Sequence, residues 1–310
     1  MIYPWNLIGH EKQLLALENE LAQDNLTHAY FFHGPKDTGK FTVALLFAKI
    51  LLCPHNLCHQ CQDCLWIESG VHPDFLLLKD EGQSLKIDDV RALVAKVSLT
   101  SQGKTRVVLI ENIERMPIEA QNSFLKTLEE PPGKTIFLLT SSHPKAVLPT
   151  ILSRVRPYEF SLVEDAEIKA ALAEKAPTPG TLDEILQMAQ GRPGLAIRLL
   201  KNPMEMAQYR DFYYKIEGFL KQNDLLSKFV FVEALEKEPS QLELFFDIFC
   251  LLLRKASHDL ISQQINTLAT HLGAEKIHEL FEKLMEARYL ISRNVNKKLV
   301  LENFFLETEQ

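Results

Sequence analysis

The first half of the chain alternates short apolar runs with longer amphipathic stretches. The short runs have the length and the aromatic or β-branched content of buried strands. The predicted strands are 29–33, 75–78, 106–110, 135–140 and 157–160. The predicted helices between them are 41–52, 87–97 and 117–130. Strands that alternate with helices predict an α/β fold with a mainly parallel sheet and helices on both of its faces.

Beyond about residue 161 the pattern is helical throughout. Residues 162–205 predict a small helical domain in which the run from Ala189 to Gly194 separates two short helices. Residues 206–310 carry apolar stripes at helical spacing, which predict a further helical core. We therefore expect the chain to divide into domains at 1–161, 162–205 and 206–310.

The run GPKDTGKFT, from Gly34 to Thr42, nearly matches a phosphate-binding loop. Gly34, Gly39 and Lys40 fit the pattern G-x-x-x-x-G-K-[ST], between a predicted strand and a predicted helix. The glycines allow backbone N–H groups to surround phosphate oxygens, and the lysine reaches the terminal phosphates. The last position is Phe41, which offers no oxygen to Mg²⁺. Thr42 would point about 100° further round the helix and is a poor substitute.

A second departure from ATPase chemistry follows the strand 106–110. In P-loop ATPases such a strand ends in an aspartate that helps to hold Mg²⁺, usually followed by a glutamate that activates water. Here Glu111 and Asn112 stand at these positions. An asparagine cannot accept a proton at neutral pH. Phe41 and Asn112 thus remove a ligand of the metal and the group that activates water at one site. This predicts an inactive site with weak or no ATP binding.

A cluster of cysteines has the spacing C-x4-C-x2-C-x2-C. Its members are Cys53, Cys58, Cys61 and Cys64. Four thiolates suit tetrahedral Zn²⁺, and a closed four-sulfur site leaves no position for a reacting water, so the predicted zinc site is structural. Buried free cysteines, an iron–sulfur cluster and a redox switch are the alternatives. His55 and His59 could compete as ligands, although four cysteines suffice.

The composition is that of an ordinary soluble protein, with 46% hydrophobic and 24% charged residues among 310. The net charge is -7, whereas a dedicated nucleic-acid binder is usually basic, so any DNA contact is expected to be local or shared with partners. There is no apolar run of transmembrane length and no secretory signal, and the crowded cysteines do not resemble a disulfide framework. These features predict a cytoplasmic protein.

Several stretches together identify a family. The most specific is 120–132, AQNSFLKTLEEPP, and Ser153-Arg154-Val155 matches a Ser-Arg-Cys motif except at its third residue. Further matching stretches are 5–11, 28–30, the cysteine cluster, 294–296 and 298–302. On these stretches the chain resembles, essentially end to end, the delta-prime family of bacterial DNA polymerase III clamp-loader subunits, which are AAA+ proteins.

The resemblance gives the predicted domains their expected roles. It implies an AAA+ ATPase-like domain over 1–161 with a zinc module at 53–64, a helical lid over 162–205 and a collar over 206–310. The collar would hold five subunits in a ring. The implied partners are the motor (gamma/tau) and delta subunits, the sliding clamp and, through the complex, primed DNA.

The resemblance also implies a role for Arg154, with Ser153 before it. In the family motif this arginine is the finger that one subunit inserts into its neighbour's ATP site. A guanidinium neutralises charge that builds on the transferred phosphoryl group and donates bidentate hydrogen bonds to it. Without the flanking pattern, a surface ion pair would be the preferred interpretation of Arg154.

The lid supplies a third departure. ATP-using relatives place an arginine where this chain has Gly194, and neither Arg192 nor Arg198 is in register. Lys40 survives, which leaves weak nucleotide binding open. The first hypothesis is therefore a clamp-loader subunit without intrinsic ATPase activity, part of the DNA polymerase III holoenzyme, which helps to load the sliding clamp during replication.

Two other functions compete with this hypothesis. The alternative is an ATP-hydrolysing motor subunit, which predicts Ser or Thr at 41, an acidic pair at 111–112 and an arginine at 194, and all three are absent. A zinc-dependent nucleic-acid binder of another kind predicts a basic face beside the cysteines, yet residues 53–70 contain no lysine or arginine.

Overall fold

The computed structural model describes residues 3–55, 57–80, 85, 87–98, 103, 105–221, 224–262, 267–293 and 295–307. The chain forms two compact units, Met1–Arg198 and Leu199–Gln310, each of which is described by itself. Asn294, the first residue of the C-terminal motif, lies outside the described residues.

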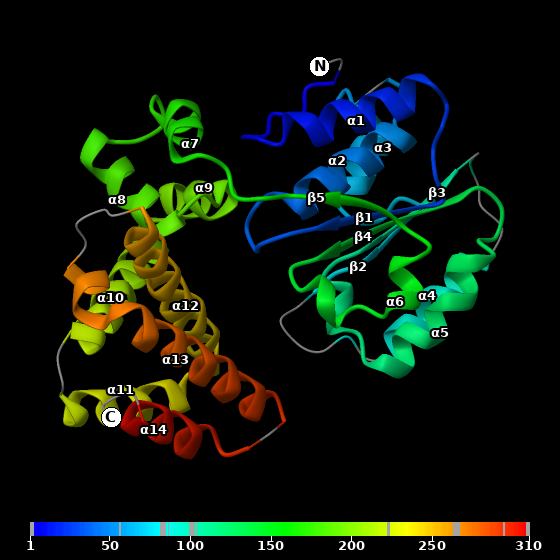
Figure 1. Cartoon of the computed structure of the whole chain (residues 1–310). Helices are drawn as coiled ribbons and strands as arrows, with labels where there is room; N and C mark the ends of the chain where they lie inside the picture. Colours follow the sequence, from blue (N-terminus) through cyan, green and yellow to red (C-terminus); the bar gives the residue numbers. More distant parts are fainter. Residues whose placement is uncertain are drawn as a thin grey trace. The chain divides into compact units, whose positions relative to one another are not determined.

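A five-stranded sheet lies at the centre of the first unit (Figure 1). Its strands are β1 (Ala29–His33), β2 (Phe75–Leu78), β3 (Arg106–Ile110), β4 (Thr135–Ser141) and β5 (Arg156–Glu159). Their order is β2-β3-β4-β1-β5, and every neighbouring pair is parallel. The predicted α/β fold is confirmed. Strand β5 begins one residue earlier than predicted and contains Pro157, which the sheet tolerates because β5 is an edge strand.

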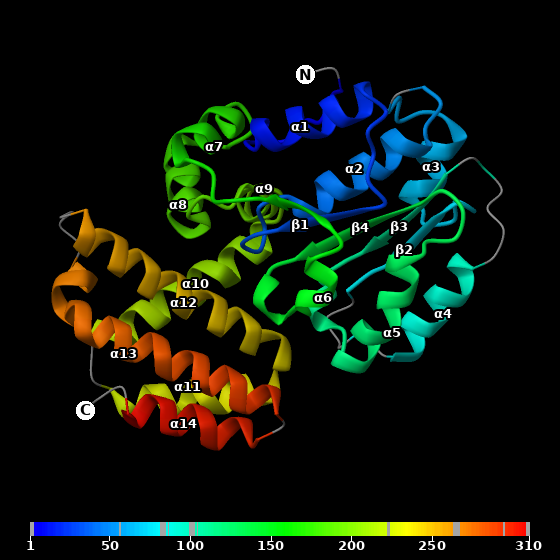
Figure 2. The same cartoon turned by 45° about the vertical axis from the view of Figure 1, so that its right-hand side comes forward.

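Helices cover both faces of this sheet (Figure 2). The helices before the last strand are α1 (Glu11–Ala22), α2 (Lys40–Leu52), α3 (Gln62–Glu68), α4 (Ile87–Val97), α5 (Ile118–Glu129) and α6 (Pro149–Leu152), with 3-10 turns at Ile113–Arg115 and Pro144–Ala146. One face packs against α1, α2 and α3, and the other packs against α4, α5 and α6. Both predicted layers of helices are therefore present.

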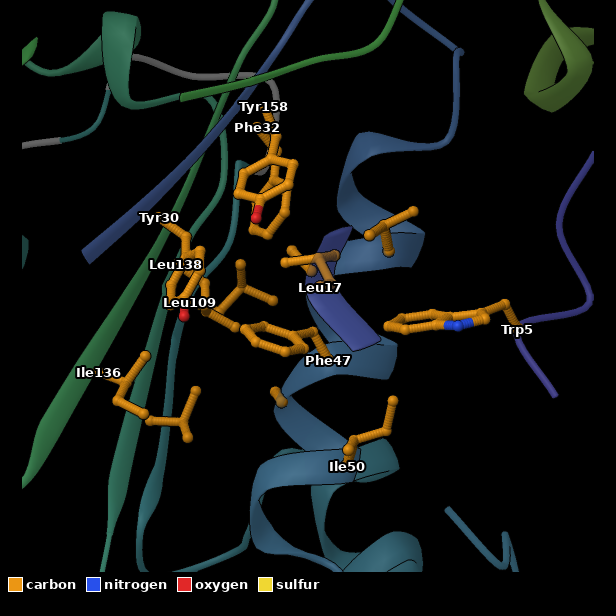
Figure 3. Packing of buried hydrophobic residues seen from close by; sticks show 14 of the residues in the cluster. Trp5, Leu17, Tyr30, Phe32, Phe47, Ile50, Leu109, Ile136, Leu138 and Tyr158 are labelled. Carbon is orange, nitrogen blue, oxygen red and sulfur yellow. The ribbon is translucent and has the colours of Figure 1, made fainter. Parts of the chain in front are cut away.

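The residues of β1 alternate between these two cores. Tyr30 and Phe32 point toward α1 and α2 (Figure 3). Phe31 instead lies in the core with α4 and α5. Trp5 is buried on the α1 and α2 side, and its indole N–H donates to Glu18 Oε1 over 2.9 Å. A strand that is buried on both faces reads as a continuous apolar run, which is why β1 could be predicted from the sequence.

The helices after β5 follow the predicted change of pattern. They are α7 (Asp165–Leu172), α8 (Pro179–Ala189) and α9 (Pro193–Lys201). The boundary between the two compact units falls inside α9. The run from Ala189 to Gly194 separates α8 from α9, as the sequence predicted.

The second unit is helical. Its helices are α10 (Pro203–Lys221), α11 (Leu225–Lys237), α12 (Pro239–Ile261), α13 (Thr267–Ser292) and α14 (Lys297–Glu307). Its core is aromatic, and the ring of Phe245 lies 5.6 Å from that of Phe249 and 5.9 Å from that of Phe305. Within the described parts of the chain, no helix combines the length and the apolar character needed to cross a membrane.

Candidate functional site

The glycine-rich loop joins β1 to α2 at the carboxyl edge of the sheet. The chain leaves β1 for β2 on one side and leaves β4 for β5 on the other, and α/β proteins bind ligands at such a divergence. Gly34 has a φ of +139°, and a Cβ there would lie 2.0 Å from Phe160 O. Close approach to the end of β5 therefore requires glycine at this position, whatever the loop binds.

Lys40 is turned back onto its own loop. The residue is 5% exposed, and its Nζ donates to Pro35 O over 2.5 Å. Thr38 Oγ1 donates to the same carbonyl over 2.9 Å. Burial lowers the pKa of Lys40 to about 8, although the carboxylates of Glu114 and Asp37 act to raise it. The ammonium group expected to reach a phosphate is thus bonded to a carbonyl oxygen of its own loop.

The surroundings of the loop include two residues named from the sequence, Phe41 and Thr42, and one that was not, His10. Thr42 is exposed on the first turn of α2, whereas Phe41 packs partly buried against the core. His10 Nε2 lies 2.9 Å from Thr38 O, and its ring lies 4.7 Å from that of Phe160. Burial lowers the pKa of His10. We did not predict this contact, because an isolated histidine carries no sequence signal for a partner so far along the chain.

The two residues after β3 form a polar network with the end of β2. Glu111 Oε2 accepts a hydrogen bond from Asp80 N over 3.1 Å, and Asn112 Nδ2 donates to Asp80 Oδ2 over 2.8 Å. Burial raises the pKa of Glu111. Residues at the positions that hold metal and activate water in P-loop ATPases therefore join neighbouring strand ends in this chain.

Glu114 is an acidic residue near the loop that sequence reasoning missed. Its Oε1 accepts hydrogen bonds from Ser142 N (2.8 Å) and His143 N (3.2 Å) at the end of β4. Burial acts to raise the pKa of Glu114, but hydrogen bonds from His143 and from backbone N–H groups outweigh it and hold that pKa below its usual range. Because Glu114 also raises the pKa of Lys40, its charge acts on the loop lysine. Its place one turn after β3 was the only available sequence signal.

Helix α9 docks directly on the glycine-rich loop. Gly194 N donates to Asp37 O over 2.8 Å, and the two terminal nitrogens of Arg198 lie 2.8 and 3.3 Å from the Asp37 carboxylate. A Cβ at Gly194 would lie 2.7 Å from Asp37 O. Arg192 instead bonds carbonyl oxygens at the end of α8. An arginine at 194 would therefore force α9 away from the loop.

We expect Gly194→Ala to destabilise the first unit by about 1–3 kcal/mol, the usual cost of forcing an extra methyl group into a packed site. Both tryptophans of the chain, Trp5 and Trp66, lie in this unit, so urea unfolding followed by tryptophan fluorescence reports its stability. Gly180→Ala is the matched control, because no atom lies within 4 Å of a Cβ there. Equal stability of the Gly194 and Gly180 variants would contradict this docking contact.

Arg154 follows α6 and is partly exposed, at 37% of its side chain. Its Nη1 donates to Thr150 O (2.8 Å) and Ser153 Oγ (3.1 Å). Its Nη2 lies 2.6 Å from Glu129 Oε1, at the end of α5. Arg154 thus makes a surface ion pair within the chain, and Ser153 contacts the same guanidinium.

The four cysteine sulfurs are brought together at the start of α3, all within 4.8 Å of one another. Cys53 Sγ lies 3.8 Å from Cys58 Sγ and 3.6 Å from Cys61 Sγ, and the cysteines are free thiols. Four sulfurs about 2.3 Å from a tetrahedral zinc would be about 3.8 Å apart. Backbone N–H groups of His55, Cys61 and Cys64 donate to these sulfurs and would support thiolates. The cluster could therefore hold a metal ion.

Comparison with known proteins decides the family. The family model described as "DNA polymerase III, delta subunit" matches residues 9–164. The DNA polymerase III subunit delta' of Pseudomonas aeruginosa is 31% identical over 99% of this chain and 97% of its own length. The chain belongs to the delta-prime family of DNA polymerase III clamp-loader subunits. The delta' subunit of Bacillus subtilis is 29% identical over 95% of this chain and 94% of its own length.

Other relatives of the delta-prime family also match. The DNA polymerase III subunit tau/gamma of Haemophilus influenzae is 35% identical over 54% of this chain and 25% of its own length. A solved structure of a DNA polymerase III gamma subunit-related protein from Thermotoga maritima covers 94% of this chain and 98% of its own, at 19% identity and a TM-score of 0.48. The five-stranded parallel sheet with helices on both faces confirms the predicted α/β module in the first unit.

Proposed function

We propose that this chain is a non-hydrolysing subunit of the DNA polymerase III clamp loader, and that it donates Arg154 to the ATP site of a neighbouring subunit. In this role it helps to load the sliding clamp onto primed DNA during replication. The chain itself would have no ATPase activity and would bind ATP weakly or not at all.

The hydrogen bonds that the loop makes within this chain carry this proposal. Lys40 donates to Pro35 O, and Asp37 is engaged by Gly194 and Arg198. A nucleotide would have to draw Lys40 away from Pro35 O, and it would still find phenylalanine where a metal-binding hydroxyl is needed. These contacts and the missing side chains support the same conclusion from independent positions.

Arg154 supplies the other half of the proposal. It is partly exposed and precedes β5, which starts beside the start of β1, whereas the glycine-rich loop follows the end of β1. A catalytic arginine that served its own loop would have to lie beside that loop. A guanidinium offered to a second chain can stabilise charge on that chain's transferred phosphoryl group. A subunit can therefore lose its own hydrolysis and still contribute to that of its neighbour.

The family supports a larger assembly. We propose an AAA+ domain over 1–161, a lid over 162–205 and a collar over 206–310 that joins five subunits in a ring. The partners would be the motor (gamma/tau) and delta subunits, the sliding clamp and, through the complex, primed DNA in the cytoplasm. Relatives named gamma or tau that match part of this chain support motor subunits of similar build.

We further propose that the metal of the cysteine cluster is a structural zinc ion. The sulfur separations fit a tetrahedral site, and four protein ligands leave no position for a reacting water. Lys49 of α2 forms an ion pair with Glu68 of α3, which ties the cysteine cluster to the helix that follows the loop.

The second candidate is an ATP-hydrolysing motor subunit of the same loader. The observation in its favour is that Gly34, Gly39 and Lys40 keep the pattern of a phosphate-binding loop. In the first candidate ATP turnover depends on Arg154 of this chain, and in the second it depends on Lys40.

Lys40→Ala tests the two candidates against each other. In a loader assembled with its motor and delta subunits, we expect this variant to hydrolyse ATP at the wild-type rate, because hydrolysis would take place at the sites of the motor subunits. Steady-state phosphate release is the measurement. A large loss of turnover in a correctly assembled ring would instead support a motor subunit.

A further inference from the structure

The guanidinium of Arg154 is held by groups from two helices that lie close together. Thr150 O, within α6, and Ser153 Oγ, directly after it, accept hydrogen bonds from Nη1, and Glu129 of α5 pairs with Nη2. Helices α5 and α6 pack in the same core, so Glu129 approaches from a fixed position. Arg154 therefore has a defined orientation before any partner arrives.

Helix stability does not explain a carboxylate at Glu129. This residue is the last of α5, where the helix dipole is negative and disfavours acidic side chains. Pro131 and Pro132 follow and stop the helix close to this point. The position is unfavourable for the helix and suited to the arginine, which indicates that Glu129 acts on Arg154.

The contacts leave part of the guanidinium for another ligand. Arginine has five N–H donors, and among the described residues Nε of Arg154 has no partner. A phosphate oxygen can approach Nε and the second hydrogen of Nη2 while Thr150, Ser153 and Glu129 keep their contacts. Glu129 is itself 45% exposed, so the pair lies at a surface that a neighbouring subunit can reach.

We infer that Glu129 is a positioning residue, which orients Arg154 for the phosphoryl group of a neighbouring ATP site. This inference rests on the proposed role of Arg154 in trans. A preoriented guanidinium loses less side-chain freedom when it meets the transition state. Removal of the Glu129 carboxylate should therefore lower kcat and leave KM for ATP unchanged.

The test compares four variants in the assembled loader, namely Glu129→Gln, Glu130→Gln, Arg154→Ala and the double variant of Glu129 and Arg154. Turnover that Arg154→Ala removes is the Arg154-dependent part. We expect Glu129→Gln to lower this part about two- to fivefold, the range supported by an exposed ion pair, with KM unchanged. Glu130→Gln, the same charge change one residue away, should have no effect. In the Arg154→Ala background, Glu129→Gln should add nothing.

The outcomes separate this inference from the proposed function. If Arg154→Ala lowers turnover and Glu129→Gln does not, Glu129 has no positioning role and the trans role of Arg154 stands. If Glu129→Gln raises turnover, the carboxylate competes with phosphate, which overturns the inference. Equal losses in the Glu129 and Glu130 variants would indicate a general effect of the helix end and also overturn it. If Arg154→Ala has no effect, the proposed function itself fails.

Discussion

Arg154→Ala is expected to lower ATP hydrolysis by the assembled clamp loader while leaving the fold of this chain and its assembly unchanged. The side chain is partly exposed and contacts Thr150, Ser153 and Glu129 among the described residues, so its removal should cost at most about 1 kcal/mol of stability. At the ATP site that it serves, loss of an arginine finger should slow hydrolysis on the order of 10³-fold or more. Total turnover should then fall to the level that the other sites supply.

Two further substitutions control this experiment. Arg154→Lys keeps the positive charge but loses the planar fork, so it should also lower turnover. Arg91→Ala removes an exposed arginine of α4 that pairs with Asp88, and should leave turnover unchanged. Full activity of Arg154→Ala in a complete ring would refute the trans role.

Loss of the cysteine cluster is expected to have the largest effect on stability. We expect about one zinc ion for each chain and its loss in Cys64→Ser, because Cys64 is fully buried and supplies one of the four sulfurs that the fold brings together. Structural zinc contributes about 10–16 kcal/mol in small zinc domains, so several kcal/mol of local stability should be lost here. Trp66 lies in α3 beside the cluster, and its fluorescence during urea unfolding should report the loss.

Metal content, measured by atomic emission, decides between the candidate forms of the cluster. Cys250 lies on α12 in the second unit, so the control variant Cys250→Ser should keep the zinc of the cysteine cluster. Iron with visible absorbance would indicate an iron–sulfur cluster, and a measured metal content of zero would remove the zinc proposal.

The sheet could be predicted because burial on both faces leaves a strong local signal. All five residues of β3 are buried and all but Arg106 are apolar, and the predicted bounds of the strand are those observed. The glycine-rich loop could be predicted for a similar reason, since its glycines, lysine and flanking elements are adjacent in sequence. Composition and local periodicity therefore suffice to predict elements that are buried on both faces.

The long-range polar contacts could not be predicted in this way. Asp37 and Arg198 are separated by 161 positions, and only the folded chain brings them together. The same holds for Glu129 beside Arg154, because either of two adjacent glutamates at a helix end has many candidate partners. The sequence shows that Phe41 and Asn112 stand where ATP hydrolysis needs a hydroxyl and a carboxylate. The hydrogen bond of Lys40 to Pro35 O, by contrast, could be found only in the structure.

The most direct test of the account is ATP hydrolysis by the purified chain, first alone and then together with its motor and delta subunits. We predict no turnover by the chain alone, and turnover in the mixture that falls when Arg154 is replaced by alanine. Metal-dependent turnover by the chain alone would contradict the account, because it would mean that a loop with Phe41 and Asn112 hydrolyses ATP and that the chain is a motor.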